Sequence, residues 1–354
     1  MKELIEIINK TSKKLNRTIT IMEVCGTHTV SIYRHGIRSV IPPNIKLLSG
    51  PGCPVCVTAV EDIDKILYIA KQPDVILVTF GDMMRVPGTN GSLYSTKAEG
   101  ALIKIVYSPL DALKIAEQNK DKKIVFFAVG FETTSPLIAA TISEAERKNI
   151  PNFYIYSVHK LIPPALKALV DSEEIKIDGF ILPGHVSTII GSKAYEFIPL
   201  KYNIACVIAG FDGDDILNAI AMLLKQIIQK DLKVEIQYKK AVKAEGNPKA
   251  IEFLYDFFEV THSKWRGIGV IPNSGLKLKR NFSHRNVEEV FNIPKIKSIE
   301  PKGCLCGLIL RGVKTPADCP FFAKSCTPEN PVGPCMVSSE GSCAAYFKYG
   351  GENF

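Results

Sequence analysis

The sequence predicts an α/β protein with two parallel-sheet α/β domains facing a cleft, plus a small cysteine-rich C-terminal domain. Short apolar runs, typical of strands buried on both faces, alternate with longer helical stretches over the first 230 residues. Beyond residue 300 the composition becomes rich in Cys, Pro and Gly, and a charged stretch near residue 118 divides the alternating region. We expect α/β domains at 1–118 and 119–240, a connecting segment at 241–300 that packs on them, and the cysteine-rich domain at 301–354.

Seven runs of β-branched and aliphatic residues are the strand candidates, and helical runs follow several of them. The candidates cover residues 18–24, 45–49, 74–80, 124–129, 152–158, 178–183 and 204–209. Helices are expected at 135–149 and 215–230, and the apolar spacing in residues 1–16 predicts an amphipathic helix. Residues 265–278 are expected to form a turn-rich, extended segment. Strand and helix in alternation are typical of parallel sheets.

Polar or Gly-rich segments follow the strand candidates directly. They are CGTHT (25–29), GPGCPVC (50–56), GDMMRVPG (81–88), GFETT (130–134), HK (159–160), PGHVS (183–187) and GFDGDD (210–215). Because ligands bind beyond the carboxyl ends of strands in open α/β sheets, we expect these segments to line one shared cleft.

The overall composition is that of an ordinary globular protein, with 46% hydrophobic and 23% charged residues. The net charge is +8, but basic and acidic residues alternate along the chain, so nucleic-acid binding is not expected. No segment is apolar and long enough to span a bilayer, and no signal peptide is evident, which favours a cytoplasmic protein. Neither phosphate-loop motif is found, so nucleotide binding is not indicated.

Six of the ten cysteines lie between Cys304 and Cys343. The six are Cys304, Cys306, Cys319, Cys326, Cys335 and Cys343. They lack the short CxxC knuckles of most structural zinc sites, whereas iron–sulfur clusters tolerate wide spacing. Disulfides do not suit a protein without an export signal. An iron–sulfur cluster is therefore favoured over zinc, and the spacing alone leaves open which four cysteines are ligands.

Two more thiol motifs stand at strand ends. Cys53 and Cys56 form a CxxC motif that can cycle between dithiol and disulfide, and a following helix start favours the thiolate. The alternative is half of a zinc site. Cys25 and His28 stand three residues apart in one turn, where they can bind a metal or form a nucleophile–base pair. The alternative there is a buried Cys and a surface His.

Glu132 in GFETT and His185 in PGHVS are weaker candidates, each found at a strand end. At the edge of the expected cleft they could move protons. The alternatives are a helix-capping acid and a hydrogen-bonded core histidine.

Several long motifs resemble those of the hydrogenase maturation protein HypD family. They are MEVCGTHT, LLSGPGCPVCVT, FGDMMRVPG, VYSPLDALKIA, FFAVGFETTSP, ILPGHVSTIIG, WRGIGVIPNSGL and the final cysteine array. The resemblance runs from about residue 20 to the end of the chain. It implies a role in assembling the iron centre of nickel–iron hydrogenases, an iron with two cyanides and one carbon monoxide. It also implies a HypC-like small chaperone and a HypE-like cyanide donor as partners, with the hydrogenase large subunit reached indirectly.

The resemblance also implies roles for individual residues. The family's cluster pattern falls on Cys306, Cys319, Cys326 and Cys343, which would hold a [4Fe–4S] cluster. Cys304 and Cys335 would then form a dithiol beside it. Cys25 would take the transient iron, with His28 nearby, and Cys53 and Cys56 would be the redox pair of the cleft.

Two hypotheses of other classes compete with this one. A ferredoxin-dependent disulfide reductase would use the tail and the CxxC motif but gives CGTHT no role. A zinc-stabilised interaction module would have no redox chemistry.

Overall fold

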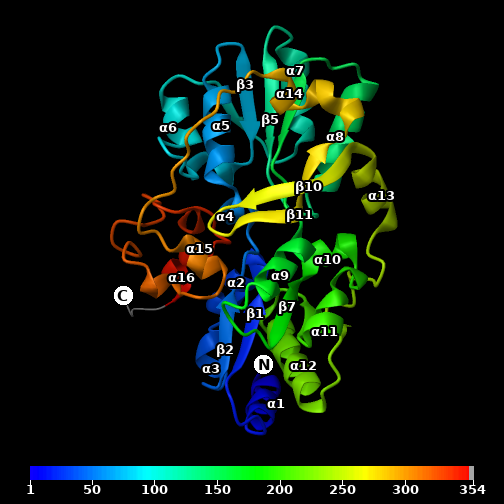
Figure 1. The fold of residues 1–354 in the computed structure, drawn as a ribbon, viewed down its shortest axis with the longest axis vertical. Helices are drawn as coiled ribbons and strands as arrows, with labels where there is room; N and C mark the ends of the chain where they lie inside the picture. Colours follow the sequence, from blue (N-terminus) through cyan, green and yellow to red (C-terminus); the bar gives the residue numbers. More distant parts are fainter. Residues whose placement is uncertain (351–354) are drawn as a thin grey trace.

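Two separate parallel sheets lie one above the other along the molecule in the computed structural model, which describes residues 1–350 (Figure 1). The lower sheet has the order β2 (Ile45–Ser49), β1 (Ile19–Glu23), β7 (Gly179–Pro183), β8 (Ala205–Ala209), β9 (Val234–Ile236). The upper sheet has the order β4 (Ile103–Ile105), β3 (Val75–Thr79), β5 (Lys123–Ala128), β6 (Phe153–Ser157). All pairings within them are parallel, which confirms the predicted fold class.

All seven strand candidates are strands, and two short edge strands, β4 and β9, were not predicted. Each of these has three residues. Most of the strand residues in the centres of the sheets are fully buried, because helices or the other elements cover both faces. The edge strands expose part of their surface, so they lack the continuous apolar run that marks the others.

The chain crosses between the sheets twice, so neither sheet is made from one continuous segment. After β1 and β2 it enters the upper sheet for β3 to β6, and then returns to the lower sheet for β7 to β9. The predicted boundary at residue 118 falls inside the upper sheet, where β3 pairs with β5 across it. The charged stretch that suggested this boundary is the turn between α7 (Leu110–Gln118) and β5.

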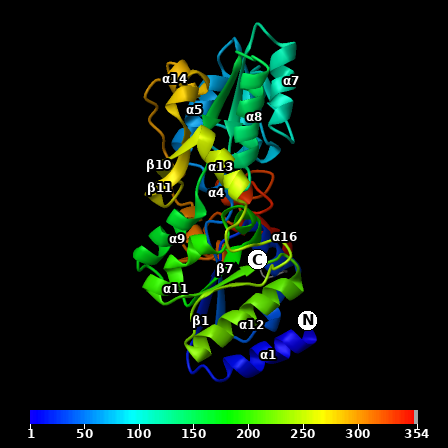
Figure 2. The ribbon, with the colours of Figure 1, turned by 90° about the vertical axis from the view of Figure 1, so that its right-hand side faces the viewer.

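Helices cover both sheets. The lower group is α1 (Lys2–Ser12), α2 (Gly26–Arg34), α3 (Ile37–Val40), α10 (Gly184–Ile190), α11 (Phe197–Tyr202) and α12 (Gly213–Gln229). The upper group is α5 (Val60–Ala70), α6 (Leu93–Ala98), α7, α8 (Ser135–Arg147) and α14 (Val287–Val290). The predicted N-terminal helix is α1, which lies along α12 at the base of the molecule (Figure 2).

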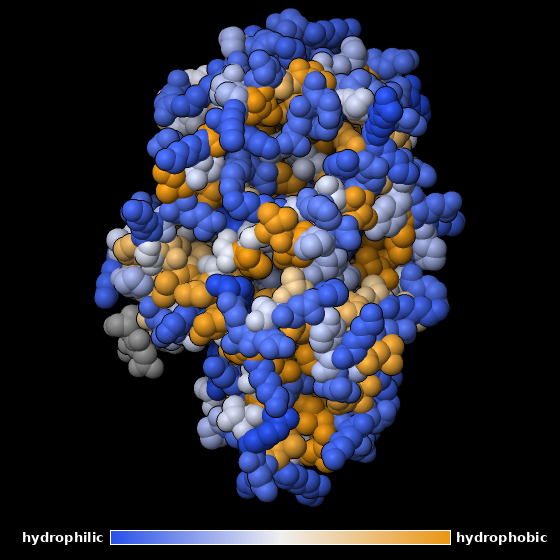
Figure 3. All heavy atoms as spheres, in the orientation of Figure 1, coloured by the Kyte–Doolittle hydropathy of each residue, from blue (hydrophilic) through white to orange (hydrophobic). Residues whose placement is uncertain are grey.

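The middle of the molecule contains α4 (Pro54–Val57), α9 (Ile162–Asp171) and an antiparallel hairpin of β10 (Phe258–Trp265) and β11 (Gly269–Leu278). The helix α13 (Pro248–Phe257) precedes the hairpin and packs on α8. Residues 265–278, expected to be extended, thus form the turn and second strand of this hairpin. Figure 3 shows hydrophobic side chains reaching the surface over the hairpin and the tail.

The cysteine-rich tail packs beside the hairpin and α4, and its helices are α15 (Cys306–Leu310) and α16 (Ser342–Tyr349). Helix α16 packs against α2, which covers the lower sheet. Residues 351–354 of the predicted 301–354 domain lie outside the described residues. No helix in residues 1–350 is long and apolar enough to cross a membrane.

Candidate functional site

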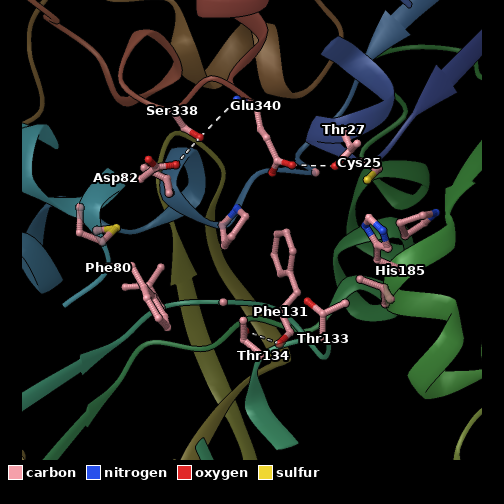
Figure 4. Close-up of a pocket in the computed structure, with 18 of the residues that line it drawn as sticks. Cys25, Thr27, Phe80, Asp82, Phe131, Thr133, Thr134, His185, Ser338 and Glu340 are labelled. Carbon is pink, nitrogen blue, oxygen red and sulfur yellow. Dashed lines mark hydrogen bonds between the residues drawn. The ribbon is translucent and has the colours of Figure 1, made fainter. Parts of the chain in front are cut away.

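A cavity of about 800 Å³ opens where the carboxyl ends of the two sheets face each other (Figure 4). Cys25, Gly52 and His185 line it from the lower sheet, whereas Phe80, Asp82, Phe131 and Thr134 line it from the upper sheet. Ser338 and Glu340 of the tail complete the wall. The cleft predicted from the strand ends is therefore present, although the HK and GFDGDD segments do not line it.

Cys25 is the N-cap residue of α2 and lies just beyond the end of β1. Its backbone is extended, and its side chain is 8% exposed at the cavity wall. Burial raises the pKa of the thiol to about 12, and the carboxylates of Glu340 and Glu23 add to the effect. The thiol is protonated at neutral pH, so a soft metal cation would have to displace its proton to bind.

Glu23 is a buried acid that the sequence analysis did not single out. Its Oε2 accepts the N–H of Cys25 at 3.0 Å, and its Oε1 accepts the hydroxyl of Thr29. Burial raises the pKa of Glu23 to about 7, although these hydrogen bonds oppose the shift. Glu23 therefore fixes the backbone that presents Cys25. An acidic residue inside an apolar strand run was the signal that could have revealed it.

His28 is fully buried behind the cavity wall and does not line the cavity. Its Nε2 donates to the carbonyls of Gly210 (2.9 Å) and Ala209 (3.3 Å), since a carbonyl can only accept. Nδ1 is then a bare acceptor, and it has no partner among the described residues. Burial lowers the pKa of His28 to about 4, so the ring is neutral and ties α2 to the end of β8.

His185 begins α10 and lines the cavity, with its ring stacked on Phe211 at a centroid distance of 3.9 Å. Partial burial lowers its pKa below the ordinary value. A neutral imidazole at the cavity wall can accept a proton or bind a metal. Cys25 and His185 are the two sequence-predicted site residues that reach this cavity.

Glu132 lies behind the cavity wall, although its neighbours Phe131 and Thr133 line the cavity. It lines a second, smaller cavity of about 330 Å³ beside α9 and α13. Its Oε1 accepts the N–H of Ile162 at 2.9 Å, while Oε2 has no partner among the described residues. Burial raises the pKa of Glu132 to about 7.

Cys53 and Cys56 are buried and do not line the cavity, although their neighbours Gly52, Pro54 and Val55 do. Cys53 is the N-cap residue of α4, which is a single turn, and the sulfur of Cys56 lies near those of Cys53 and Cys335. These neighbouring sulfurs and burial raise the pKa of Cys56 well above its ordinary value. The thiolate expected from the start of the following helix, α5, is therefore not favoured at Cys56, because burial among other thiols outweighs the effect of that helix.

The tail cysteines gather in the same buried core as Cys53 and Cys56. Cys335, which is fully buried, has its sulfur against those of Cys56, Cys306 and Cys343. Cys304 lies beside Cys306 instead. All ten cysteines are free thiols in the structure. Cys335 is therefore the sulfur of the tail that touches the CxxC motif.

The donor chemistry of this array fits an iron–sulfur cluster. Within residues 1–350, no three His, Cys, Asp or Glu side chains converge as ligands of one ion. In a [4Fe–4S] cube each thiolate binds a different iron, so the sulfurs need not converge on one point. The donors are soft, buried sulfurs, and the N–H of Val332 points at the Cys326 sulfur (3.3 Å), a contact that favours a thiolate.

The tail also reaches into the cleft and touches both sheets. Thr27 donates its hydroxyl to Glu340 Oε1 at 2.6 Å on the lower side. Ser338 donates to Asp82 Oδ2 at 3.0 Å on the upper side (Figure 4). Cys335 and Cys343 flank this segment in the sequence. The thiol array and the cavity are thus joined by one short stretch of chain.

Fold and site together define a two-sheet α/β protein in which a cysteine-rich domain closes one side of the cleft. The chain belongs to the HypD family, whose profile, described as "Hydrogenase formation hypA family", matches residues 1–350. It is 47% identical to hydrogenase maturation factor HypD2 of Bradyrhizobium diazoefficiens over 93% of this chain and 89% of that protein. It is 46% identical to a putative hydrogenase expression/formation protein of Methanocaldococcus jannaschii, over 99% of this chain and 97% of that protein. Hydrogenase maturation factor HypD of Azotobacter vinelandii is 45% identical over 94% and 90% respectively.

Proposed function

We propose that this protein is a hydrogenase maturation factor of the cytoplasm, which holds an iron atom at Cys25 while its cyanide and carbon monoxide ligands are completed. The observation that carries the proposal is the position of Cys25, a cysteine at the wall of the interdomain cavity with a histidine, His185, on the same wall. Thiolate suits a low-spin, electron-rich iron. The iron unit is cargo of this site, not a resident part of it.

Cys25 binds the incoming iron as a thiolate and releases its proton on binding. The backbone N–H groups of His28 and Thr27 lie close enough to the sulfur to lower its pKa, and they stabilise the thiolate once it forms. Glu23 holds the loop in place through the N–H of Cys25. His185, neutral at pH 7, is the base on the cavity wall that accepts the released proton.

The tail would hold a [4Fe–4S] cluster on Cys306, Cys319, Cys326 and Cys343, with Cys304 and Cys335 as adjacent thiols. When bound, such a cluster supplies single electrons. The sulfur contact between Cys335 and Cys56 supports a thiol route from the tail to the CxxC motif. In that route the Cys335 thiolate attacks Cys56 of a Cys53–Cys56 disulfide and releases Cys53. Cys304 then attacks Cys335 and releases Cys56, so that two electrons pass from the tail dithiol to the CxxC motif.

The proposed partners are those that the family resemblance implies. A HypC-like small chaperone presents its own iron ligand at the cavity mouth, opposite Cys25. A HypE-like protein delivers cyanide there, and the hydrogenase large subunit receives the finished iron unit indirectly.

A disulfide reductase that uses an external one-electron donor is the second candidate function, favoured by the Cys335–Cys56 contact. It differs in needing neither Cys25 nor the cavity. Substitution of Cys25 therefore distinguishes the two functions.

The test is anaerobic purification of Cys25→Ala with the small chaperone, followed by iron analysis and infrared spectroscopy. The expected result is loss of the cyanide and carbonyl stretches and of the iron in excess of about four per chain, with the brown cluster retained. Cys206→Ala is the matched control, because Cys206 is fully buried in β8, away from the cavity. If Cys25→Ala retained the infrared bands, Cys25 would not hold the iron. A colourless, zinc-containing wild type would exclude both candidate functions.

A further inference from the structure

Arg266 is a buried arginine at the turn between β10 and β11 to which the proposed function gives no role. It is 3% exposed. Its main-chain N–H donates to the carbonyl of Val57 at 2.9 Å, one residue beyond Cys56. Its Nη1 donates to the carbonyl of Pro87 at 2.8 Å. The side chain is thus fixed between the CxxC loop and the upper half of the cleft.

The remaining end of this guanidinium, Nη2, is buried and has no hydrogen-bond partner among residues 1–350. Arg285, equally buried, differs because Glu146 and the carbonyls of Ile150 and Phe153 satisfy it. A buried arginine stays positively charged, because its guanidinium does not lose a proton under ordinary conditions. An uncompensated buried charge is costly, so the structure calls for an anion facing Nη2.

Cys306, Cys304 and Cys335 of the tail lie within electrostatic range of the Arg266 guanidinium, as does Glu300, and each stabilises its charge when ionised. Glu300 is an exposed side chain at the surface, where it accepts the N–H of Gly267 at 3.4 Å, so it compensates the buried end poorly.

A close backbone contact fixes Arg266 against the tail. Gly267, next in the chain, packs on Gly307, so that a β-carbon added to Gly307 would lie 2.5 Å from the carbonyl oxygen of Gly267. Cys306 immediately precedes Gly307. The hairpin turn therefore cannot move away from the cysteines without breaking this packing.

We propose that Arg266 is the counter-charge of the tail's iron–sulfur cluster and favours its one-electron reduction, an inference that rests on the proposed function. A [4Fe–4S] core on four thiolates is an anion, and reduction adds one more negative charge. A fixed cation beside it stabilises the reduced state more than the oxidised state. The electron comes from an external one-electron donor of the ferredoxin class; Arg266 stays protonated, and no bond to it forms or breaks.

Arg266 is accordingly a positioning residue, and the reduction potential is the quantity that reports its role. The experiment is a redox titration of the anaerobically purified protein, with dithionite and mediators, followed by electron paramagnetic resonance. In Arg266→Gln the equilibrium constant for reduction should fall at least tenfold, which lowers the potential by about 59 mV for one electron. Arg266→Lys keeps the charge, so its reduction potential should fall less than that of Arg266→Gln.

Lys264→Gln is the matched control, since it removes the same charge two residues away. Lys264 pairs with Glu61 at the surface and is 47% exposed, so its loss should leave the potential unchanged. Equal shifts in Lys264→Gln and Arg266→Gln would mean that any nearby charge suffices, and the proposal would fail.

Two further outcomes are decisive. If Arg266→Gln loses the cluster, Arg266→Lys should restore it, whereas loss in both variants would mean that the shape of arginine matters and overturn the counter-charge. A wild type without any iron–sulfur signal would refute the proposed function itself. A wild-type cluster whose potential is the same in Arg266→Gln would refute this inference alone.

Discussion

At the scale of single residues, Glu132 gives the molecule a pH dependence that can be measured without any cofactor. Glu132 is 3% exposed, has no cation beside its carboxyl among residues 1–350, and has a pKa raised by burial to about 7. The folded state therefore holds a proton that the unfolded chain, with a pKa near 4.5, releases. Between these two values the native state gains stability as pH falls and loses it as pH rises.

Replacement of Glu132 by Gln should remove this dependence. Relative to Glu132→Gln, the free energy of unfolding of the wild type should fall by up to about 3 kcal/mol between pH 5 and pH 8. Urea unfolding at several pH values measures it. Parallel pH profiles for the two proteins would contradict the raised pKa.

Which residues matter could be predicted from the sequence where the chemistry is unusual for its place. Cys25 and His185 follow apolar strands and do reach the cavity. His28 and Glu132 also follow strands, but their side chains lie behind the cavity wall, because a tight turn points successive side chains to different sides. Glu23 could have been noticed as an acid inside an apolar strand run, whereas Arg266 could not be assigned, since its role depends on a partner far away in the sequence.

At the scale of elements, the hairpin of β10 and β11 holds the tail against the rest of the molecule. Its turn lies between α4 and α15. The Arg266–Val57 hydrogen bond joins the turn to α4, and the Gly267–Gly307 contact joins it to α15. The antiparallel pairing has an irregularity between Thr261 and Ser263, which interrupts the alternation that marks a strand. This explains why the sequence predicted an extended segment but not a hairpin.

Gly307→Ala should separate this turn from the tail. The new β-carbon would meet the oxygen of Gly267 at 2.5 Å, and neither backbone can yield easily. We expect a loss of about 1–3 kcal/mol in the free energy of unfolding, although alanine normally favours a helix such as α15.

Gly81→Ala is the control for this change. A β-carbon there meets nothing closer than Ile105 at 3.6 Å, so the stability should change little. A Gly307→Ala protein as stable as Gly81→Ala in thermal unfolding would show that the hairpin contact is loose.

At the scale of the whole molecule, the interleaved path of the chain was beyond sequence reasoning. The strands of both sheets look alike, being short, apolar and followed by polar loops, so nothing in the chain tells which strands pair. The shared cleft could still be predicted because it depends only on the direction of the strands. The crossings have a mechanical consequence: the sheets are connected by segments near α4 and α9, by the segment that runs from β9 through α13 and the hairpin to α14, and by the tail.

The tail should therefore depend on its metal more than the sheets do. Within residues 301–350 it is rich in turns and has only two short α-helices, so without its cofactor it has little apolar core of its own. After iron is removed by a chelator, proteolysis within residues 301–349 should accelerate at least about tenfold, while the α/β body resists. Mass spectrometry of the fragments locates the cuts.

The Cys319→Ser variant provides the control, because it lacks one proposed cluster ligand before any chelator is added. Its tail should be cleaved rapidly from the start, and chelation should add little. The tail also bridges the cleft through Thr27–Glu340 and Ser338–Asp82, so its release should raise hydrogen exchange at residues 25–29 and 81–85 as well. If the chelated wild type resisted protease as the metal-bound protein does, the tail would owe its order to the thiol core alone, and the cofactor would have no structural role.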